Sequence, residues 1–417
     1  MKILFLGLNY APEEIGIGLY SGDMTKAWAE SGHDVCAVVA TPYYPAWKVF
    51  DGYAGKGWRH TKEAGVEITR CPIYIPSNPS GAKRIVHHLS FFVSTLFPLL
   101  KAALRDKPDV VFTVAPSLIG APVAWLAARL CGAQCWLHVQ DFEMEAAFAT
   151  GLVDEGSLAS RIGPWVERTV IRLFDWTSSI SPQMCAKLAE KGVPKDRIYQ
   201  FRNWADINAV RPLNGISPYR AEWGVKAPHV ALYSGNIANK QGIEVVLKAA
   251  RLLRHRKDLI FVICGEGPNR ENLEAAATDL DNIQFHDLQP RERLNDLLGM
   301  ATVHLMPQLA GAADLVLPSK LTNMLASGRP IVATAEPGTG LADEVEGCGV
   351  LTPPGSAEDF AEGIETLIDA PAMAANYGKA ARARAEERWA KEPILSRLAA
   401  RMALQSKVPA TGVESRA

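Results

Sequence analysis

Short apolar runs alternate with amphipathic segments of helix length along most of the chain. In the first half these runs are KILFLGL (2–8), DVCAVVA (34–40), DVVFTVA (109–115) and QCWLHV (134–139). Each run has the length of a buried strand, and the segments between them have the periodicity of surface helices. The alternation is typical of βαβ units, in which helices connect the strands of a parallel sheet.

A second series of strands begins at residue 229 with HVALYSG and continues to PIVATA at 330–335. A polar segment that contains prolines, residues 203–218, separates the two series and has the composition of a linker. We therefore predict an α/β protein with two Rossmann-like, doubly wound domains, in which ligands bind at the carboxyl ends of the strands. The predicted domains are 1–208 and 209–391, and a last helix at about 392–417 returns to the first domain.

Length and charge limit the class of partner. The chain has 417 residues, of which 21% are charged, and its formal net charge is −1. This length is too great for one ordinary core and agrees with two domains. Because there is no excess of positive charge, nucleic acid is not expected as a partner, and a small or neutral ligand fits better.

Cysteine usage and the N-terminus predict a cytoplasmic protein. The seven cysteines are odd in number, scattered and mostly inside apolar runs, as reduced core residues are, and their spacing does not indicate a metal site. A strand pattern begins after one lysine, so no signal peptide is expected. The longest apolar run, residues 89–100, is interrupted by Pro98 and is shorter than the roughly 20 residues that a bilayer requires.

The glycine-rich stretch GLNYAPEEIGIGLYSG, residues 7–22, has some features of a dinucleotide site. A dehydrogenase requires an acidic residue at the end of the second strand to hold the ribose. That strand ends here in Thr41 and Pro42, which disfavours an NAD-dependent oxidoreductase. Two interpretations stay open: the glycines only permit a tight turn, or Gly16 and Gly18 let a phosphate or sugar approach the positive end of the helix.

The stretch YSGNIANKQG is a more specific signal. It places Gly235 and Asn236 directly after a strand, and Lys240 and Gln241 at the start of an amphipathic helix. Backbone N–H groups, an amide and an ammonium group would converge there, which suits a diphosphate. The alternative for Lys240 is a solvated surface lysine.

A third glycine turn, ICGEGP, places Gly265 and Glu266 after another strand. Close approach to the backbone at this point would suit a nucleobase or a ribose. Each of the three loops is a weak signal alone, but the series together indicates a nucleotide ligand.

The order of motifs closely resembles the family 4 glycosyltransferases, which have the GT-B fold. The resemblance extends to about Trp389 and rests on NYAPEEIGIGLYSG, SGHDV, SISPQM, RNW, YSGN…QG, ICGEGP, VLPSKLTNMLASGRPIVAT and GVLTPPGSAEDF. It implies two Rossmann-like domains that face each other across a cleft, the first for the acceptor and the second for the donor. DLVLPSKLTNML and LHVQDFEMEAA are most similar to the colanic acid type of exopolysaccharide glycosyltransferase.

The resemblance also implies an activity and a set of contacts. The activity is a retaining transfer of a hexosyl or deoxyhexosyl group from a nucleotide sugar to a saccharide on a polyprenyl diphosphate, without a metal or another cofactor. Residues expected to bind the diphosphate are Gly235, Asn236, Lys240 and Gln241. Gly265 and Glu266 are expected to bind the nucleoside, and Gly16 and Gly18 the reacting sugar and phosphate.

The stretch ADLVLPSKLTNMLASGRP departs from the family pattern. Many relatives carry two glutamates here, one for the hydroxyls of the donor sugar and one for the ribose, and these positions fall on Leu315 and Asn323. Asn323 can still hydrogen-bond a ribose hydroxyl, and Asp314 can reach the sugar if the loop shifts. The loss of both glutamates leaves the donor sugar undefined.

Lys320 is the cation expected to stabilise the phosphates. Pro318 suits the first turn of a helix, which leaves Ser319 and Lys320 at the N-terminal end. In this interpretation Lys320 replaces the lysine or arginine that relatives carry nearer Asn236 and Gln241.

The segment LHVQDFEMEAA places His138 and Asp141 just past a buried strand. One interpretation of His138 is a structural histidine with satisfied hydrogen bonds. By resemblance, His138 lies near the donor sugar and Asp141 in the acceptor cleft, where a carboxylate orients or deprotonates an acceptor hydroxyl.

Residues 82–105 (AKRIVHHLSFFVSTLFPLLKAALR) combine cations with apolar residues. They form either a helix packed on the sheet or a patch at the inner membrane surface. In the second case Lys83 and Arg84 meet anionic headgroups, and Phe91, Phe92 and Phe97 enter the lipid boundary.

Two further functions remain as alternatives to transfer. An epimerase of the same fold needs several carboxylates and histidines around the sugar, and the second domain has few. A scaffold that binds a nucleotide sugar without turnover is compatible with Leu315 and Asn323 in place of glutamates.

Overall fold

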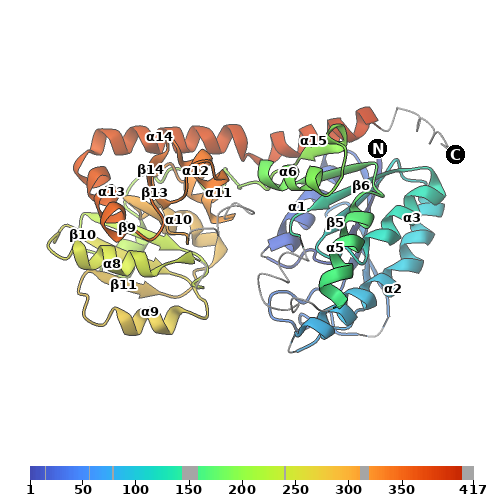
Figure 1. Ribbon diagram of the computed structural model, residues 1–417, viewed down its shortest axis with the longest axis horizontal. Coiled ribbons are helices and arrows are strands. Elements are labelled where there is room, and N and C mark those ends of the chain that lie inside the picture. Colours follow the sequence, from blue (N-terminus) through green and yellow to red (C-terminus); the bar gives the residue numbers. More distant parts are fainter. Residues whose placement is uncertain are drawn as a thin grey trace. The chain divides into compact units, whose positions relative to one another are not determined.

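The chain divides into two compact units, each built on one sheet (Figure 1). Unit 1 comprises Met1–Phe201 with the segment from Leu395, and unit 2 comprises Arg202–Ile394. The structure is a computed structural model that describes residues 1–14, 16–55, 57–77, 79–142, 158–238, 241–309 and 319–405.

The described strands of unit 1 form one sheet in the order β3-β4-β2-β1-β5-β6-β7-β8. All neighbours pair in parallel except β3 and β4, which are antiparallel. β5 is buried along its whole length, as expected of a central parallel strand that is covered on both faces. The strands are β1 Lys2–Gly7, β2 Asp34–Ala40, β3 Arg59–Glu63, β4 Val66–Cys71, β5 Val110–Ala115, β6 Gln134–Val139, β7 Trp176–Ser179 and β8 Ile198–Gln200.

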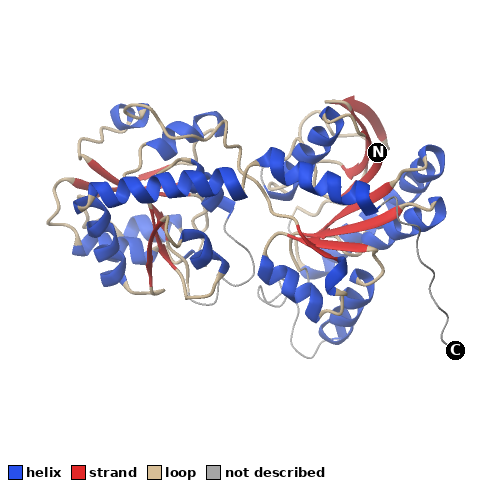
Figure 2. Cartoon of the chain, turned by 90° about the horizontal axis from the view of Figure 1, so that it is seen from above, coloured by secondary structure: helices blue, strands red, loops and turns tan. Residues whose placement is uncertain are grey.

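Helices cover both faces of this sheet, as Figure 2 shows. On one face Trp28 of α1 packs edge-on against Phe112 of β5, with ring centroids 5.3 Å apart. On the other face Phe91 and Leu99 of α2 join Val111 in the main core. The described helices of unit 1 are α1 Gly16–Glu30, α2 Gly81–Asp106, α3 Ala121–Cys131, α5 Leu158–Ile171, α6 Pro182–Glu190 and most of α15 Lys391–Gln405.

The described strands of unit 2 form a fully parallel sheet in the order β11-β10-β9-β12-β13-β14. Phe261 and Tyr233 point toward α8 and α13, and Met306 and Ile331 point toward α11 and α12. The strands are β9 His229–Ser234, β10 Leu259–Cys264, β11 Ile283–His286, β12 Val303–Met306, β13 Ile331–Thr334 and β14 Gly349–Thr352. The helices are α7 Pro218–Glu222, α8 Glu244–Leu252, α9 Arg270–Ala276, α10 Leu294–Gly299, α11 Ser319–Ala326, α12 Gly340–Val345, α13 Ala357–Asp369 and α14 Pro371–Arg388.

The strand order fixes where each unit can bind a ligand. The order reverses between β1 and β5 in unit 1 and between β9 and β12 in unit 2. In open α/β sheets a crevice forms at this reversal, outside the carboxyl ends of the two strands. The glycine loops after β1 and after β9 both lie at such a point.

Helix α2 extends beyond the apolar run at 89–100 on both sides. It has 26 residues, and by length and composition alone it passes as a candidate membrane span. His87, Phe91, Thr95 and Leu99 nevertheless lie on one buried face at helical spacing. The contacts of this face with the sheet and with α3 are those of a core helix. The expectation that Phe91 enters lipid is wrong, because Phe91 is 2% exposed.

The last helix, α15, returns to unit 1. Its residue Arg401 stacks over the ring of Trp176 on β7, with 4.7 Å between the guanidinium carbon and the ring centroid. Unit 1 therefore includes the C-terminal segment of the chain.

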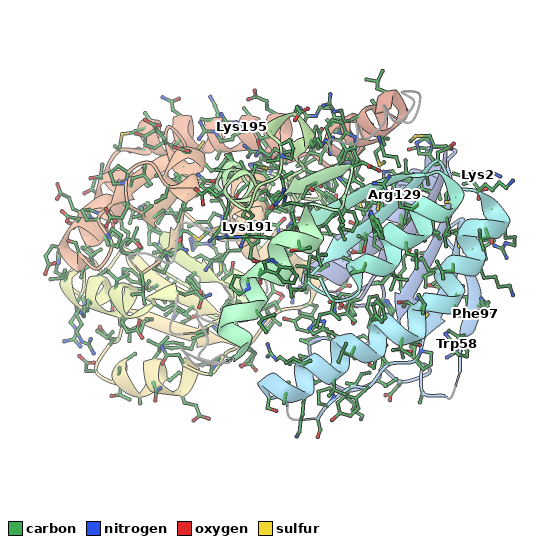
Figure 3. The ribbon with its side chains drawn as sticks, turned by 45° about the vertical axis from the view of Figure 1, so that its right-hand side comes forward. Lys2, Trp58, Phe97, Arg129, Lys191 and Lys195 are labelled. Atoms are coloured by element: carbon green, nitrogen blue, oxygen red, sulfur yellow. The ribbon has the colours of Figure 1, made fainter. Side chains whose placement is uncertain are left out.

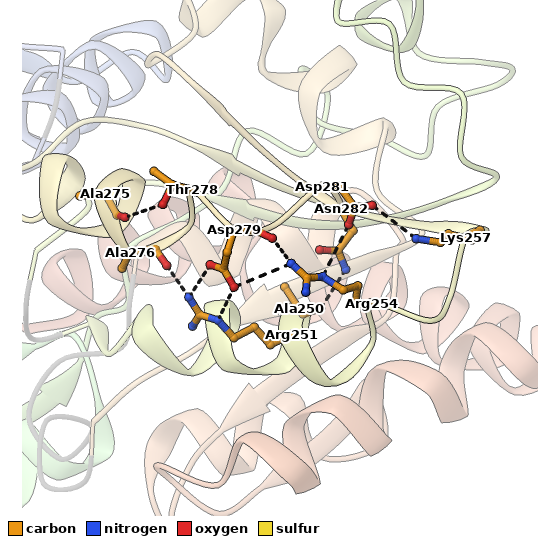
Figure 4. A network of polar contacts seen from close by, with 10 residues as sticks. All are labelled: Ala250, Arg251, Arg254, Lys257, Ala275, Ala276, Thr278, Asp279, Asp281 and Asn282. Carbon is orange, nitrogen blue, oxygen red and sulfur yellow. Dashed lines mark hydrogen bonds and ion pairs between the residues drawn. The ribbon is translucent and has the colours of Figure 1, made fainter.

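A surface network ties the end of α8 to the turn that leads into β11 (Figure 4). Arg251 pairs with Asp279 at 2.9 Å, and Arg254 donates to the carbonyl oxygen of Asp279. Asn282 donates to the carbonyl of Ala250 at 2.9 Å. The ion pairs are exposed, so each contributes at most about 1 kcal/mol to stability.

Candidate functional site

The loops after β9 and β10 support each other at the carboxyl edge of unit 2. Gly265 and Gly267 have φ values of 149° and 158°. A Cβ atom at Gly265 would lie 1.9 Å from the carbonyl oxygen of Gly235, and one at Gly267 would lie 2.1 Å from that of Ile237. The two backbones are therefore in direct contact, and the amide of Ile237 donates to the carbonyl of Glu266 at 2.8 Å. Because the neighbouring loop occupies the space beside both glycines, they serve to hold this edge rigid.

Lys320 lies at the same edge, in the first turn of α11. Its Cδ atom would be 3.1 Å from a Cβ atom at Gly235, so the side chain runs along the glycine turn after β9. Its Nζ atom lies 3.9 Å from the centroid of the Tyr233 ring. Although the residue as a whole is partly exposed, Nζ is buried and has no hydrogen-bond partner among the described residues.

The environment of Lys320 suits an anionic ligand. Burial away from water lowers the pKa of its amine to about 7. A buried amine without an acceptor is unfavourable when charged, unless a negative group approaches it. The hydroxyl of Tyr233 donates to the carbonyl of Asn236 at 2.6 Å and so fixes the turn beside Lys320.

The structure describes some of the other residues that the sequence analysis predicts for donor binding. Asn236 is exposed, and Gln241 is half-buried with an Oε1 atom that has no hydrogen-bond partner among the described residues. The exposed carboxylate of Glu266 pairs with Arg270 at 2.6 Å, so a ribose would compete with that arginine. Asn323 is half-buried on α11, whose first residue is Ser319. Lys240, Asp314 and Leu315 lie outside the described residues.

In unit 1 the glycine motif is explained largely by packing. A Cβ atom at Gly18 would lie 2.6 Å from both Cβ and Oε2 of Glu13. Glu13 is buried and accepts hydrogen bonds from Asn9 and from the amides of Tyr43 and Tyr44, at 2.9 to 3.0 Å. Burial raises the pKa of Glu13 despite these hydrogen bonds. Gly18 therefore lets α1 approach the carboxylate that joins the loops after β1 and β2.

Gly16 differs from Gly18 because it is exposed. Its φ of 62° is in the left-handed region at the start of α1, and a Cβ atom there would be 3.8 Å from the ring of Tyr44. The turn conformation accounts for this glycine, and its position at the helix start leaves room for a ligand.

His138 is placed in the core. Its Nδ1 atom is 3.0 Å from the hydroxyl of Ser178, and its ring packs against Phe201 at 4.8 Å. Burial lowers the pKa of His138 to about 3, so the ring is neutral. These contacts favour the structural interpretation of His138, and its role near the donor sugar stays a prediction. Asp141 is exposed directly after β6, as a residue that meets an acceptor would be.

The sequence did not indicate the roles of two residues, Tyr233 in unit 2 and Glu13 in unit 1. Tyr233 is one of several apolar residues of a buried strand, and only its place next to the glycine turn distinguishes it. Glu13 stands in the polar stretch PEE, where nothing indicates burial. Among the described residues no group of three His, Cys, Asp or Glu side chains is arranged to hold a metal ion.

Two family profiles cover most of the chain. Residues 16–204 match the glycosyl transferase 4-like domain, and residues 217–384 match glycosyl transferases group 1. The chain is 40% identical over 406 residues to WcaI of Escherichia coli strain K12, a protein named for glycosyl transfer in colanic acid biosynthesis, and the match covers 95% of this chain and 98% of that one.

The chain belongs to the group 1 glycosyl transferases. This confirms the family that the sequence resembles. An α-D-kanosaminyltransferase of Streptomyces kanamyceticus is a more distant relative of this glycosyl transferase, 24% identical over 74% of this chain and 81% of that one.

Solved structures confirm the GT-B fold of this glycosyl transferase. Sucrose-phosphate synthase from Thermosynechococcus elongatus has a TM-score of 0.74 at 17% identity, covering 97% of this chain and 98% of that one. HepE from Anabaena in complex with UDP has a TM-score of 0.71 at 16% identity, covering 97% and 100%.

Proposed function

We propose that this glycosyltransferase moves a hexosyl or deoxyhexosyl group from a nucleotide-diphosphate sugar to a saccharide on a polyprenyl diphosphate, in the synthesis of an exopolysaccharide like colanic acid. One observation carries the proposal: the buried Nζ of Lys320 beside Gly235, without an acceptor among the described residues, at the carboxyl ends of β9 and β12. A diphosphate supplies the missing negative charge. The relation to WcaI and the UDP and UDP-glucose bound to HepE support this assignment.

The donor diphosphate lies on the turn after β9 in this proposal. Lys320 contacts the phosphates together with the backbone of Gly235, and the nucleoside lies toward Gly265. The family resemblance adds to donor binding the residues Asn236, Lys240, Gln241, Glu266, Asp314, Ser319 and Asn323, and it assigns contacts with the sugar and phosphate to Gly16 and Gly18.

The reaction is a retaining displacement that uses no cofactor. The bond between the anomeric carbon and the diphosphate oxygen breaks, the acceptor hydroxyl oxygen bonds to that carbon on the same face, and its proton passes to the departing diphosphate. Lys320 stabilises the charge that grows on the leaving group. Asp141 orients the acceptor hydroxyl, and His138 supports this edge of unit 1.

The outer face of α2 brings the enzyme to the cytoplasmic face of the inner membrane, where a polyprenyl-linked acceptor resides. Val93 and Phe97 are 68% and 71% exposed on this face. The indole N–H of Trp58 donates to the carbonyl of Ser94 at 2.9 Å, which places Trp58 beside Phe97 (Figure 3). Lys83 and Lys101 are exposed near the two ends of this apolar stripe, where anionic headgroups would meet them.

Flotation of the protein with liposomes tests this surface. Phe97→Ser removes the most exposed phenylalanine of α2, and we expect it to weaken binding to vesicles of anionic lipid about tenfold. Leu288→Ser is the matched control, since Leu288 is 65% exposed in unit 2. If Phe97→Ser and Leu288→Ser bind the vesicles equally well, α2 does not contact the membrane.

Transfer itself is measured with nucleotide sugars and a polyprenyl diphosphate saccharide. The proposal predicts an elongated lipid-linked product whose new linkage keeps the anomeric configuration of the donor. Release of an isomerised nucleotide sugar without transfer would establish an epimerase. Binding of a nucleotide sugar without any product would establish the scaffold that the loss of both family glutamates allows.

A further inference from the structure

Tyr233 is a buried residue whose ring and hydroxyl both contact residues of the proposed donor site. It is fully buried on β9, one residue before the strand ends. Its ring lies 3.9 Å below Nζ of Lys320, and its hydroxyl donates to the carbonyl of Asn236 at 2.6 Å. The same side chain thus contacts the cation and the turn on which the diphosphate is placed.

The inward direction of Lys320 needs a cause. A lysine near a helix terminus normally extends its flexible stem so that the ammonium reaches water. Here Nζ is buried and meets the face of an aromatic ring, with no hydrogen-bond acceptor among the described residues. The negative face of a tyrosine ring attracts a cation, and this attraction grows when the pair is shielded from water.

We propose that Tyr233 is the positioning residue of the donor site: its ring holds the ammonium of Lys320 beside Gly235, and its hydroxyl fixes the Asn236 turn, before the nucleotide diphosphate binds. Both groups are then in place and need no reorganisation when the negative charge arrives. The inference rests on the proposed function, because it assigns Tyr233 a role only if the ligand is a nucleotide diphosphate.

A second tyrosine of unit 2 provides a matched control. Tyr219 is also fully buried, its ring lies 4.0 Å from the guanidinium carbon of Arg293, and its hydroxyl donates to Gln289 at 3.0 Å. Tyr219→Leu therefore removes the same kinds of contact as Tyr233→Leu, a ring beneath a cation and a hydroxyl hydrogen bond. The cation in this case is Arg293 instead of Lys320.

A double-mutant cycle tests the inference. Affinity is measured by calorimetry for the one of UDP, GDP, ADP and dTDP that binds the wild-type protein best. Tyr233→Leu is expected to weaken binding about tenfold when Lys320 is present, and less than about twofold in the Lys320→Met background. Tyr233→Phe keeps the ring and stays within about threefold of the wild type. Tyr219→Leu leaves the affinity unchanged in both backgrounds.

Equal losses from Tyr233→Leu in both backgrounds would overturn the inference, because the residue would then act through the fold. If none of the four nucleotides binds the wild type, the proposed function fails instead. If Lys320→Met alone has no effect, the phosphate site is misplaced.

Nuclear magnetic resonance of labelled lysine keeps the inference testable if Tyr233→Leu does not fold. A methylene group held over an aromatic ring has its proton resonances shifted upfield. We expect such a shift for the ε-methylene of Lys320 in the wild type and in Tyr233→Phe, identified by its loss in Lys320→Arg. Ordinary chemical shifts for all lysines would exclude the contact.

Discussion

At the scale of single residues, we propose that Lys320 binds the donor and that Asp141 orients the acceptor. Lys320→Ala is expected to weaken binding of the nucleotide sugar about 100-fold, because a charge-assisted contact to a phosphate contributes up to about 3 kcal/mol. Asp141→Ala is expected to leave this affinity within about threefold and to lower kcat instead. Calorimetry and the transfer assay, applied to both variants, separate the two effects. Equal affinity of the wild type and Lys320→Ala would refute the phosphate site.

The lowered pKa of Lys320 predicts how donor affinity depends on pH. The amine of the free protein has a pKa of about 7 and loses its proton above that pH. A bound diphosphate favours the charged amine, so binding takes up a proton and affinity falls as the pH rises, by up to about tenfold for each pH unit above 7. The diphosphate of a nucleotide sugar keeps its charge throughout this range, so the ligand contributes nothing to the slope.

Lys320→Arg is the control for this profile, since arginine stays charged at every pH used. Its affinity is expected to be flat between about pH 6 and 9. Buffers with different ionisation enthalpies report the proton uptake directly in the calorimeter. A flat profile for the wild type would show that Lys320 is not the titrating group.

At the scale of elements, the rigidity of the β9 and β10 loops depends on glycine. A Cβ atom at Gly265 would lie 1.9 Å from a backbone oxygen, so Gly265→Ala must move one loop. We expect a loss of about 2–3 kcal/mol in unfolding free energy, together with weaker nucleotide binding. Gly215→Ala is the control: Gly215 has a φ of 108°, but no described atom lies within 4 Å of the position that a Cβ atom would take there. It is expected to lose only about 1 kcal/mol and no affinity.

The sequence located these glycine loops but left open what approaches the backbone there. Spacing after a strand predicts close approach to the backbone, yet it does not say whether a ligand or a neighbouring loop makes the approach. Gly265 and Gly18 meet parts of the protein itself. The direction of the Lys320 side chain could not be predicted either. The sequence places this residue at the start of a helix but does not show that the ring of Tyr233 lies beneath its amine.

The sequence also does not predict which face of helix α2 is buried. Its residues are apolar on more than one side, so periodicity predicts an amphipathic helix but not which phenylalanine turns inward. Phe91 lies in the core and Phe97 outside, because the positions of the sheet and of α3 decide the buried face. The doubly wound parallel class of both domains, by contrast, follows from the βαβ rhythm, which the sequence does carry.

At the scale of the whole molecule, the two connections between the units are anchored by one carboxylate in unit 2. Glu344 is 3% exposed on α12. It accepts hydrogen bonds from Arg202 at 2.7 Å and from the indole of Trp389 at 3.1 Å, and it pairs with Arg388 at 3.3 Å. Arg202 lies on the first connection and Trp389 on the second, and the amide of Ala205 donates to the carbonyl of Trp389 at 2.8 Å.

Glu344→Ala is therefore expected to lower the unfolding free energy by about 3–5 kcal/mol, because it removes the buried acceptor that two arginines and an indole N–H share. Urea denaturation measures the loss. Glu222→Ala serves as the control, since Glu222 pairs with Arg293 at the surface and its removal should leave the midpoint nearly unchanged. A wild-type midpoint for Glu344→Ala would show that the connections are held by other contacts.

In the proposed function the nucleotide diphosphate binds at the carboxyl ends of β9 and β12. Hydrogen exchange of backbone amides, with and without the nucleotide that binds best, tests this most directly. We expect slower exchange in residues 235–242 and 265–269 and in the first turn of α11, and no such change in the network of Arg251 and Asp279. Protection confined to other parts of the chain would rule out this donor site.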